Sequence, residues 1–123
     1  KIKKFATPKE AVKGVNALYT DVWTSMGFEK ENEARLRAFD GYQLNAELYS
    51  LAQPGAVIMH CLPMVKGLEI THEMAEHEHS VLFQQAENRL HAQKALLSGL
   101  FGPARLKKSV KLSEDFNGAT IRL

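Results

Sequence analysis

Three segments of the 123-residue sequence carry reactive side chains just after apolar runs. The runs occupy residues 17–19, 56–59 and 80–83. Short apolar runs bounded by polar residues are typical of buried strands, and ligands of open α/β sheets bind just outside the carboxyl ends of the strands. We therefore expect Asp21, Cys61 and Arg89 to bring a carboxylate, a thiol and a guanidinium to one edge of a sheet.

The same segments contain three motifs, which read Asp21-Val22-Trp23-Thr24-Ser25-Met26-Gly27, His60-Cys61-Leu62-Pro63 and Ala86-Glu87-Asn88-Arg89. In this order they resemble the D-x-W-x-S-M-G, H-C-L-P and A-E-N-R segments of the ornithine carbamoyltransferases. The resemblance covers roughly residues 11–97. It implies an enzyme without cofactor or metal that moves the carbamoyl group of carbamoyl phosphate to the side-chain amine of L-ornithine. The products are citrulline and phosphate, in arginine biosynthesis or catabolism.

The resemblance also implies roles for individual residues. The expected catalytic residues are Asp21, Cys61 and Arg89. The expected ornithine contacts are Asp21, Ser25, Met26, Cys61 and Leu62. The expected contacts to carbamoyl phosphate are His60, Cys61, Leu62 and Arg89. The turn at Ser25 suits the carboxylate of an amino acid if it opens a helix, because a helix N-terminus favours negative charge; an ordinary capping turn is the alternative.

The chemistry expected of Asp21 and Cys61 follows from the pKa of an alkyl amine. An ammonium that titrates near ~10.4 costs about 4–5 kcal/mol to deprotonate at pH 7, and only the neutral amine can attack a carbonyl. A carboxylate favours the ammonium form, so Asp21 suits orientation of the amine. A cysteine, which accepts a proton as the thiolate, is more suitable as the acceptor, and we expect Cys61 to take part in holding and deprotonating the amine. The alternative for Cys61 is an inert buried thiol.

Arg89 would stabilise the negative charge that builds on the carbamoyl oxygen in the transition state. The alternative is a surface arginine at the start of a helix, paired with Glu87. His60 either hydrogen-bonds the carbamoyl group or satisfies a buried carbonyl, and Trp23 is expected to pack rather than to contact a ligand.

Only half of such an enzyme is visible in this sequence. The S-T-R-T and H-P-x-Q segments that bind carbamoyl phosphate in the family do not occur in it. We therefore expect an N-terminal carbamoyl phosphate domain to be missing, a homotrimer in the full-length parent, and no turnover by this polypeptide alone. A related enzyme for putrescine or N-acylated ornithine, or a non-catalytic ligand-binding or assembly module of the same fold, remains an alternative.

Composition sets limits on the partners and the compartment. The net charge is +2, and the basic residues near both ends have no interleaved aromatic residues, so we expect no nucleic-acid partner. We expect no membrane partner either, since no apolar stretch approaches the ~20 residues of a membrane span. A single cysteine indicates a reducing compartment, cytoplasmic or another such as the mitochondrial matrix. His72 and His77 are five residues apart, which is poor spacing for shared metal ligation on a helix.

The alternation of expected elements predicts an α/β fold, a partial Rossmann-like three-layer domain with a parallel sheet flanked by helices. Residues 1–102 would form the ornithine-binding portion, and 103–123 an unplaced tail that forms two strands around residues 114–118 or is loosely ordered. Strands are predicted at residues 17–19, 56–60 and 80–83. Helices are predicted at residues 9–13, 29–39, 45–52, 71–78 and 87–100, and the last would leave an apolar face uncovered.

Overall fold

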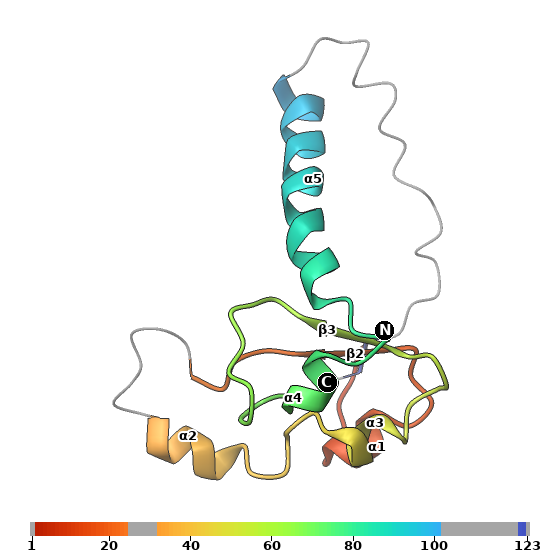
Figure 1. Cartoon of the computed structure of the whole chain (residues 1–123), viewed down its shortest axis with the longest axis vertical. Helices are drawn as coiled ribbons and strands as arrows, with labels where there is room; N and C mark the ends of the chain where they lie inside the picture. The colour runs from red at the N-terminus through yellow and green to blue at the C-terminus, as the bar shows by residue number, and fades with distance from the viewer. Residues whose placement is uncertain (1, 25–31, 102–120, 123) are drawn as a thin grey trace.

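The computed structural model of the chain describes residues 2–24, 32–101 and 121–122. Their elements, in chain order, are β1 (Ile2–Lys3), α1 (Pro8–Ala11), β2 (Ala17–Thr20), α2 (Asn32–Ala38), α3 (Ala46–Tyr49), β3 (Val57–His60), α4 (His72–Ala75), α5 (Leu82–Phe101) and β4 (Ile121–Arg122). Figure 1 shows α5 rising from one side of β2 and β3, with α1, α3 and α4 on the other side. The predicted α/β fold with helices on both sides of a sheet is confirmed.

The two central strands, β2 and β3, pair in parallel, as predicted. Their register joins Ala17 to Val57 and Thr20 to His60. Asp21 and Cys61 each come one residue after this last pair, at the carboxyl ends of adjacent strands. Because side chains alternate between the two faces of a sheet, these two residues also share a face. The short strands β1 and β4 form a second parallel pair.

Three short helices begin where the sequence places a side chain that caps them. The side chains of Thr7, Asn45 and Thr71 each accept a hydrogen bond from the backbone N–H three residues later, which satisfies one of the free donors of the first turn. Pro8 stands at the first helical position of α1, where its missing N–H costs nothing. These helices line one side of the core, whose buried apolar residues are Leu18, Leu44, Leu48, Ala56, Ile58, Ile70, Met74, Ala75 and Leu82.

The third predicted strand, at residues 80–83, is wrong. Ser80 forms only an isolated parallel bridge with Ile58, and the N–H of Val81 donates to the carbonyl of Ile58 at 2.9 Å. The chain then turns into α5 at Leu82, so that the predicted helix at residues 87–100 begins five residues earlier. A four-residue apolar run does not distinguish a strand from the first turn of a helix. Leu82 is fully buried whereas Phe83 is 64% exposed, because the helix turns Phe83 away from the core.

Most of α5 extends beyond the body of the fold (Figure 1). Large apolar side chains along it are exposed: Phe83, Leu90, Leu96, Leu97, Leu100 and Phe101. The predicted uncovered apolar face is therefore confirmed. Within the described residues, no helix combines the length and apolar character needed to cross a membrane. Of the tail for which two strands around residues 114–118 were predicted, the structure describes only β4 (Ile121–Arg122); residues 102–120 lie outside the described residues.

Candidate functional site

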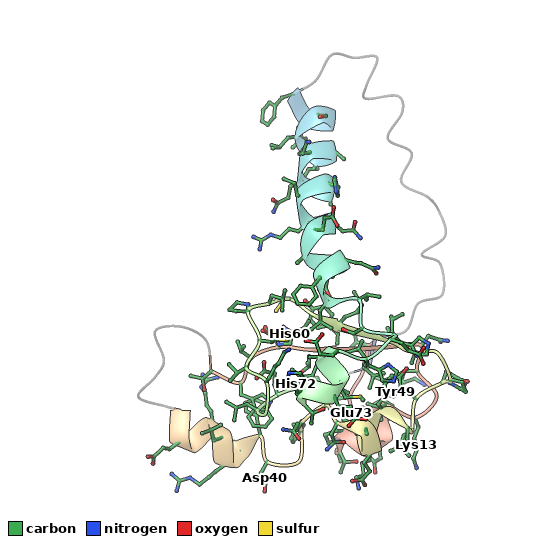
Figure 2. The ribbon with its side chains drawn as sticks, viewed as in Figure 1. Lys13, Asp40, Tyr49, His60, His72 and Glu73 are labelled. Carbon is green, nitrogen blue, oxygen red and sulfur yellow. The ribbon has the colours of Figure 1, made fainter. Side chains whose placement is uncertain are left out.

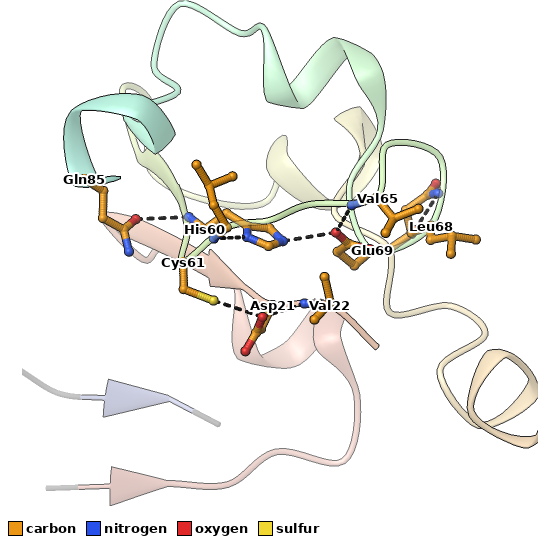
Figure 3. Close-up of polar contacts among 10 residues, drawn as sticks. Asp21, Val22, His60, Cys61, Val65, Leu68, Glu69 and Gln85 are labelled. Atoms are coloured by element: carbon orange, nitrogen blue, oxygen red, sulfur yellow. Dashed lines mark hydrogen bonds and ion pairs between the residues drawn. The ribbon is translucent and has the colours of Figure 1, made fainter. Parts of the chain in front are cut away.

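The structure brings Asp21 and Cys61 into direct contact (Figure 3). The thiol of Cys61 donates a hydrogen bond to Oδ1 of Asp21 across 2.9 Å, and both side chains are exposed at the sheet edge. The same carboxylate oxygen accepts the backbone N–H of Val22 at 2.7 Å, which fixes its direction. Two residues that are 40 positions apart in sequence thus form one accessible acid–thiol pair.

The environment of Cys61 keeps its sulfur protonated. Burial raises the pKa of the Cys61 thiol, and the hydrogen bond to Asp21 and the charge of that carboxylate raise it further. The side chain of Tyr19 acts in the opposite direction and lowers the pKa of Cys61. At neutral pH the pair is therefore a carboxylate that accepts and a thiol that donates. An incoming ammonium group would compete with the thiol for the same carboxylate oxygen.

His60 lies inside the body of the fold near the foot of α5, with a side chain that is fully buried (Figure 2). Its Nδ1 accepts the backbone N–H of Leu62 at 2.8 Å, so a neutral ring carries its proton on Nε2. That nitrogen faces Oε1 of Glu69 at 3.1 Å. Both ring nitrogens are thus engaged by the protein, and the expected contact of His60 with carbamoyl phosphate stays a prediction.

Glu69 was not predicted as part of the site. It is fully buried, and its Oε1 also accepts the backbone N–H of Val65 at 2.6 Å. These bonds tie the loop that follows β3 back to the strand end, and Leu62 within that loop takes a positive φ of 58°. A non-glycine residue at positive φ is held there only by the surrounding contacts. Here the N–H of Leu62 is held by His60, so the buried pair shapes the backbone next to Cys61.

Gln85 on the first turn of α5 was also missed, and it joins the helix to both strands. Its Oε1 accepts the backbone N–H of His60 at 3.1 Å, and its Nε2 donates to the hydroxyl of Tyr19 at 3.2 Å. Nothing in the sequence marks a glutamine as part of a site. Its role emerges only when the start of the helix is placed over the strand ends.

Arg89 lies on the second turn of α5 and is exposed, so the expectation that it follows a strand end is wrong. Residues four apart share a face of a helix, which places Arg89 one turn beyond Gln85 on the face that meets the strands. The alternative partner Glu87 instead lies 3.6 Å from Nε2 of His91. The transition-state role of Arg89 stays a prediction.

The remaining predicted contacts are only partly visible. Ser25 and Met26 lie outside the described residues. Leu62 directly follows Cys61 in the loop, with its N–H engaged by His60. Trp23 packs as expected: its ring stacks on that of Phe39, with centroids 5.9 Å apart and an interplanar angle of 14°.

Two groups of ligand-type side chains gather within the described residues, each with its ligand atoms within 4.8 Å of one another: Asp21, His60 and Cys61, and His77, Glu78 and His79. Internal hydrogen bonds already occupy ring nitrogens in both groups. The backbone N–H of His79 donates to Nδ1 of His77 at 3.1 Å, and Nδ1 of His79 lies 2.9 Å from the hydroxyl of Tyr49. The expectation of no metal stays a prediction.

Comparison with known proteins identifies the class to which this fold and site belong. Residues 1–100 match the family model described as aspartate/ornithine carbamoyltransferase, Asp/Orn binding domain. The chain belongs to this family and represents its Asp/Orn-binding domain.

Individual relatives agree with this assignment. The chain is 56% identical over 102 residues to an ornithine carbamoyltransferase of Archaeoglobus fulgidus, covering 83% of this chain and 33% of that protein. It is 54% identical over 102 residues to one from Methanothermobacter thermautotrophicus, covering 83% and 34%. The solved structure of the Pyrococcus furiosus ornithine carbamoyltransferase superposes with a TM-score of 0.69 at 48% identity, covering 74% of this chain and 29% of that one. The chain therefore spans about a third of the length of the curated relatives it matches.

Proposed function

We propose that this chain is the ornithine-binding part of an ornithine carbamoyltransferase, which transfers the carbamoyl group of carbamoyl phosphate to the side-chain amine of L-ornithine. The observation that carries the proposal is the contact between Asp21 and Cys61 at the ends of adjacent strands. An acid and a thiol that share one hydrogen bond form a polar pair of the right size to hold a single ammonium group. The names of the matched relatives support ornithine as the acceptor.

The pair would first orient the amine. An ammonium that enters the site donates to Asp21 in place of the thiol, because a charge-assisted hydrogen bond is stronger than one from a neutral S–H. Its positive charge then favours the thiolate of Cys61, since an opposite charge nearby favours the ionised form. The thiolate, formed by loss of the thiol proton to solvent, would then accept a proton from the ammonium and leave the neutral amine beside the thiol.

The neutral amine would then attack the carbamoyl carbon. A C–N bond forms, negative charge collects on the carbamoyl oxygen, and the bond to the phosphate oxygen breaks, so that phosphate leaves with the electron pair and takes up the extra proton of the nitrogen. Arg89, on the helix face that meets the strand ends, would stabilise the charge on the oxygen. Such stabilisation acts on the transition state more than on the substrate and raises the rate.

The carbamoyl phosphate site requires more chain than is present here. This chain covers only about a third of the length of its relatives, and the exposed apolar side chains of α5 form a surface that another part of the parent would cover. We propose that a carbamoyl phosphate domain supplies the missing groups and that the parent assembles as a homotrimer. The polypeptide alone should then produce no citrulline from ornithine and carbamoyl phosphate in a colorimetric assay.

Calorimetric titration of the chain with three small molecules tests the proposed acceptor. L-Ornithine should bind more tightly than L-norvaline, which has the same carbon skeleton without the side-chain amine, and more tightly than putrescine, which lacks the amino-acid end. The difference from norvaline is expected to be about tenfold or more, because a hydrogen bond to a charged group contributes about 1.5–3 kcal/mol.

Two outcomes would contradict the proposal. Equal affinity for ornithine and norvaline would remove Asp21 and Cys61 as the amine site. Tighter binding of putrescine would identify the related putrescine enzyme instead.

A further inference from the structure

Tyr19 lies on the same face of the sheet as the acid–thiol pair. Along β2, Leu18 is buried in the core while Tyr19 is 58% exposed, as expected for side chains that alternate between faces. Tyr19 is in register with Met59, and Asp21 and Cys61 each come two residues after this pair. The phenol therefore lies one step below the candidate site, on the side from which α5 begins.

Gln85 determines which way the hydroxyl of Tyr19 can donate. The backbone N–H of His60 is a donor, so the amide oxygen of Gln85 must face it, and the amide nitrogen must face Tyr19. The oxygen of Tyr19 thus accepts a hydrogen bond from Gln85. Its own O–H cannot be used in that contact and is left to donate to another group.

We propose that Tyr19 is a positioning residue for Cys61: with its oxygen held by Gln85, the hydroxyl donates to the sulfur of Cys61 and fixes the direction in which that sulfur meets the substrate amine. The sulfur would then donate to Asp21 and accept from Tyr19 at the same time. When it becomes a thiolate, the Tyr19 O–H remains as a donor to the negative charge. The effect of Tyr19 on the substrate amine rests on the proposed function, whereas its contact with the sulfur does not.

The electrostatics of the two residues agree with this arrangement. Burial raises the pKa of Tyr19 most, the hydrogen bond from Gln85 lowers it, and the interaction with Cys61 raises it. The interaction with Tyr19 lowers the pKa of Cys61, as expected if the phenol donates to the sulfur. The other titratable groups near the sulfur are Asp21 at the end of β2 and His60, whose ligand atoms lie with the sulfur within 4.8 Å of one another. Asp21 and Tyr19 shift the pKa of Cys61 in opposite directions. Asp21 raises this pKa, and Tyr19 lowers it.

The pH dependence of thiol alkylation tests the proposal without any ligand. Cys61 is the only cysteine of the chain, so the rate of reaction with iodoacetamide reports on this sulfur alone. Tyr19→Phe should raise the apparent pKa of Cys61 and slow alkylation at pH 8 by about threefold, because only the thiolate reacts. Asp21→Asn removes a group that raises the pKa of Cys61, so it should speed the reaction.

Two further variants make the test specific. Gln85→Glu offers a carboxylate oxygen that would accept the Tyr19 O–H and draw it away from the sulfur, so it should slow alkylation as Tyr19→Phe does. Tyr42→Phe removes a phenol elsewhere on the surface and should leave the pH profile of alkylation unchanged. An unchanged profile for both Tyr19→Phe and Gln85→Glu, with folding verified by circular dichroism, would overturn the role of Tyr19. That result would not bear on the ornithine titration, which tests the proposed function independently.

Discussion

Replacement of Asp21 by asparagine is expected to weaken the binding of L-ornithine at least about tenfold. Asparagine keeps the size and one carbonyl oxygen of the side chain but lacks the negative charge that holds an ammonium group. Hydrogen bonds to charged groups contribute about 1.5–3 kcal/mol, which corresponds to roughly 10- to 150-fold in affinity. Calorimetric titration of the wild-type and Asp21→Asn chains under the same conditions measures the difference.

The control for this variant is its affinity for norvaline. Asp21 is exposed, so the fold should be retained and norvaline should bind both chains equally. Equal weakening of ornithine and norvaline would show that the substitution disturbs the amino-acid end of the site. Unchanged ornithine affinity would show that the carboxylate does not hold the amine.

Replacement of His60 by leucine is expected to destabilise the fold by at least about 2 kcal/mol. The substitution removes the partner of a fully buried carboxylate, Glu69, and the acceptor for the N–H of Leu62. The second oxygen of Glu69 is already buried without a hydrogen-bond partner among the described residues, so loss of His60 would leave the carboxylate with the N–H of Val65. A buried polar group left unsatisfied costs about 1–3 kcal/mol, and more if it is charged. Urea denaturation followed by circular dichroism measures the change.

The same substitution at an exposed histidine provides the matched control. His72→Leu on α4 alters an exposed residue at the first helical position and should change the free energy of unfolding by less than about 0.5 kcal/mol. If His60→Leu proved as stable as the wild-type chain, the bonds to Glu69 and Leu62 could not be what holds the loop beside Cys61.

The central strands could be predicted from short apolar runs that end in polar residues. The runs that form β2 and β3 are apolar and followed at once by polar residues or proline, and the ends of parallel strands must meet at one edge of the sheet. The run at residues 80–83 looks the same in sequence but becomes the start of α5. Whether this run forms a strand depends on how it pairs with Ile58 in the folded protein, where Ser80 forms an isolated bridge. A local sequence pattern does not contain this information.

The residues of the candidate site also fall into those that the sequence could predict and those that it could not. Asp21 and Cys61 belong to motifs, and their contact follows from the register of two strands. Glu69, Gln85 and Tyr19 carry no motif signal, because each acts through a hydrogen bond to a group distant in sequence. A buried glutamate and an amide between helix and strand become visible only when the packing is known.

The most direct test of the account is a double-mutant cycle on ornithine affinity with Asp21→Asn, Cys61→Ser and the double variant. If the carboxylate and the sulfur hold one amine together, their effects should not add, and the coupling should be about 0.5 kcal/mol or more for ornithine. For norvaline the coupling should be absent. Purely additive effects on ornithine binding would contradict a shared amine site at the ends of β2 and β3.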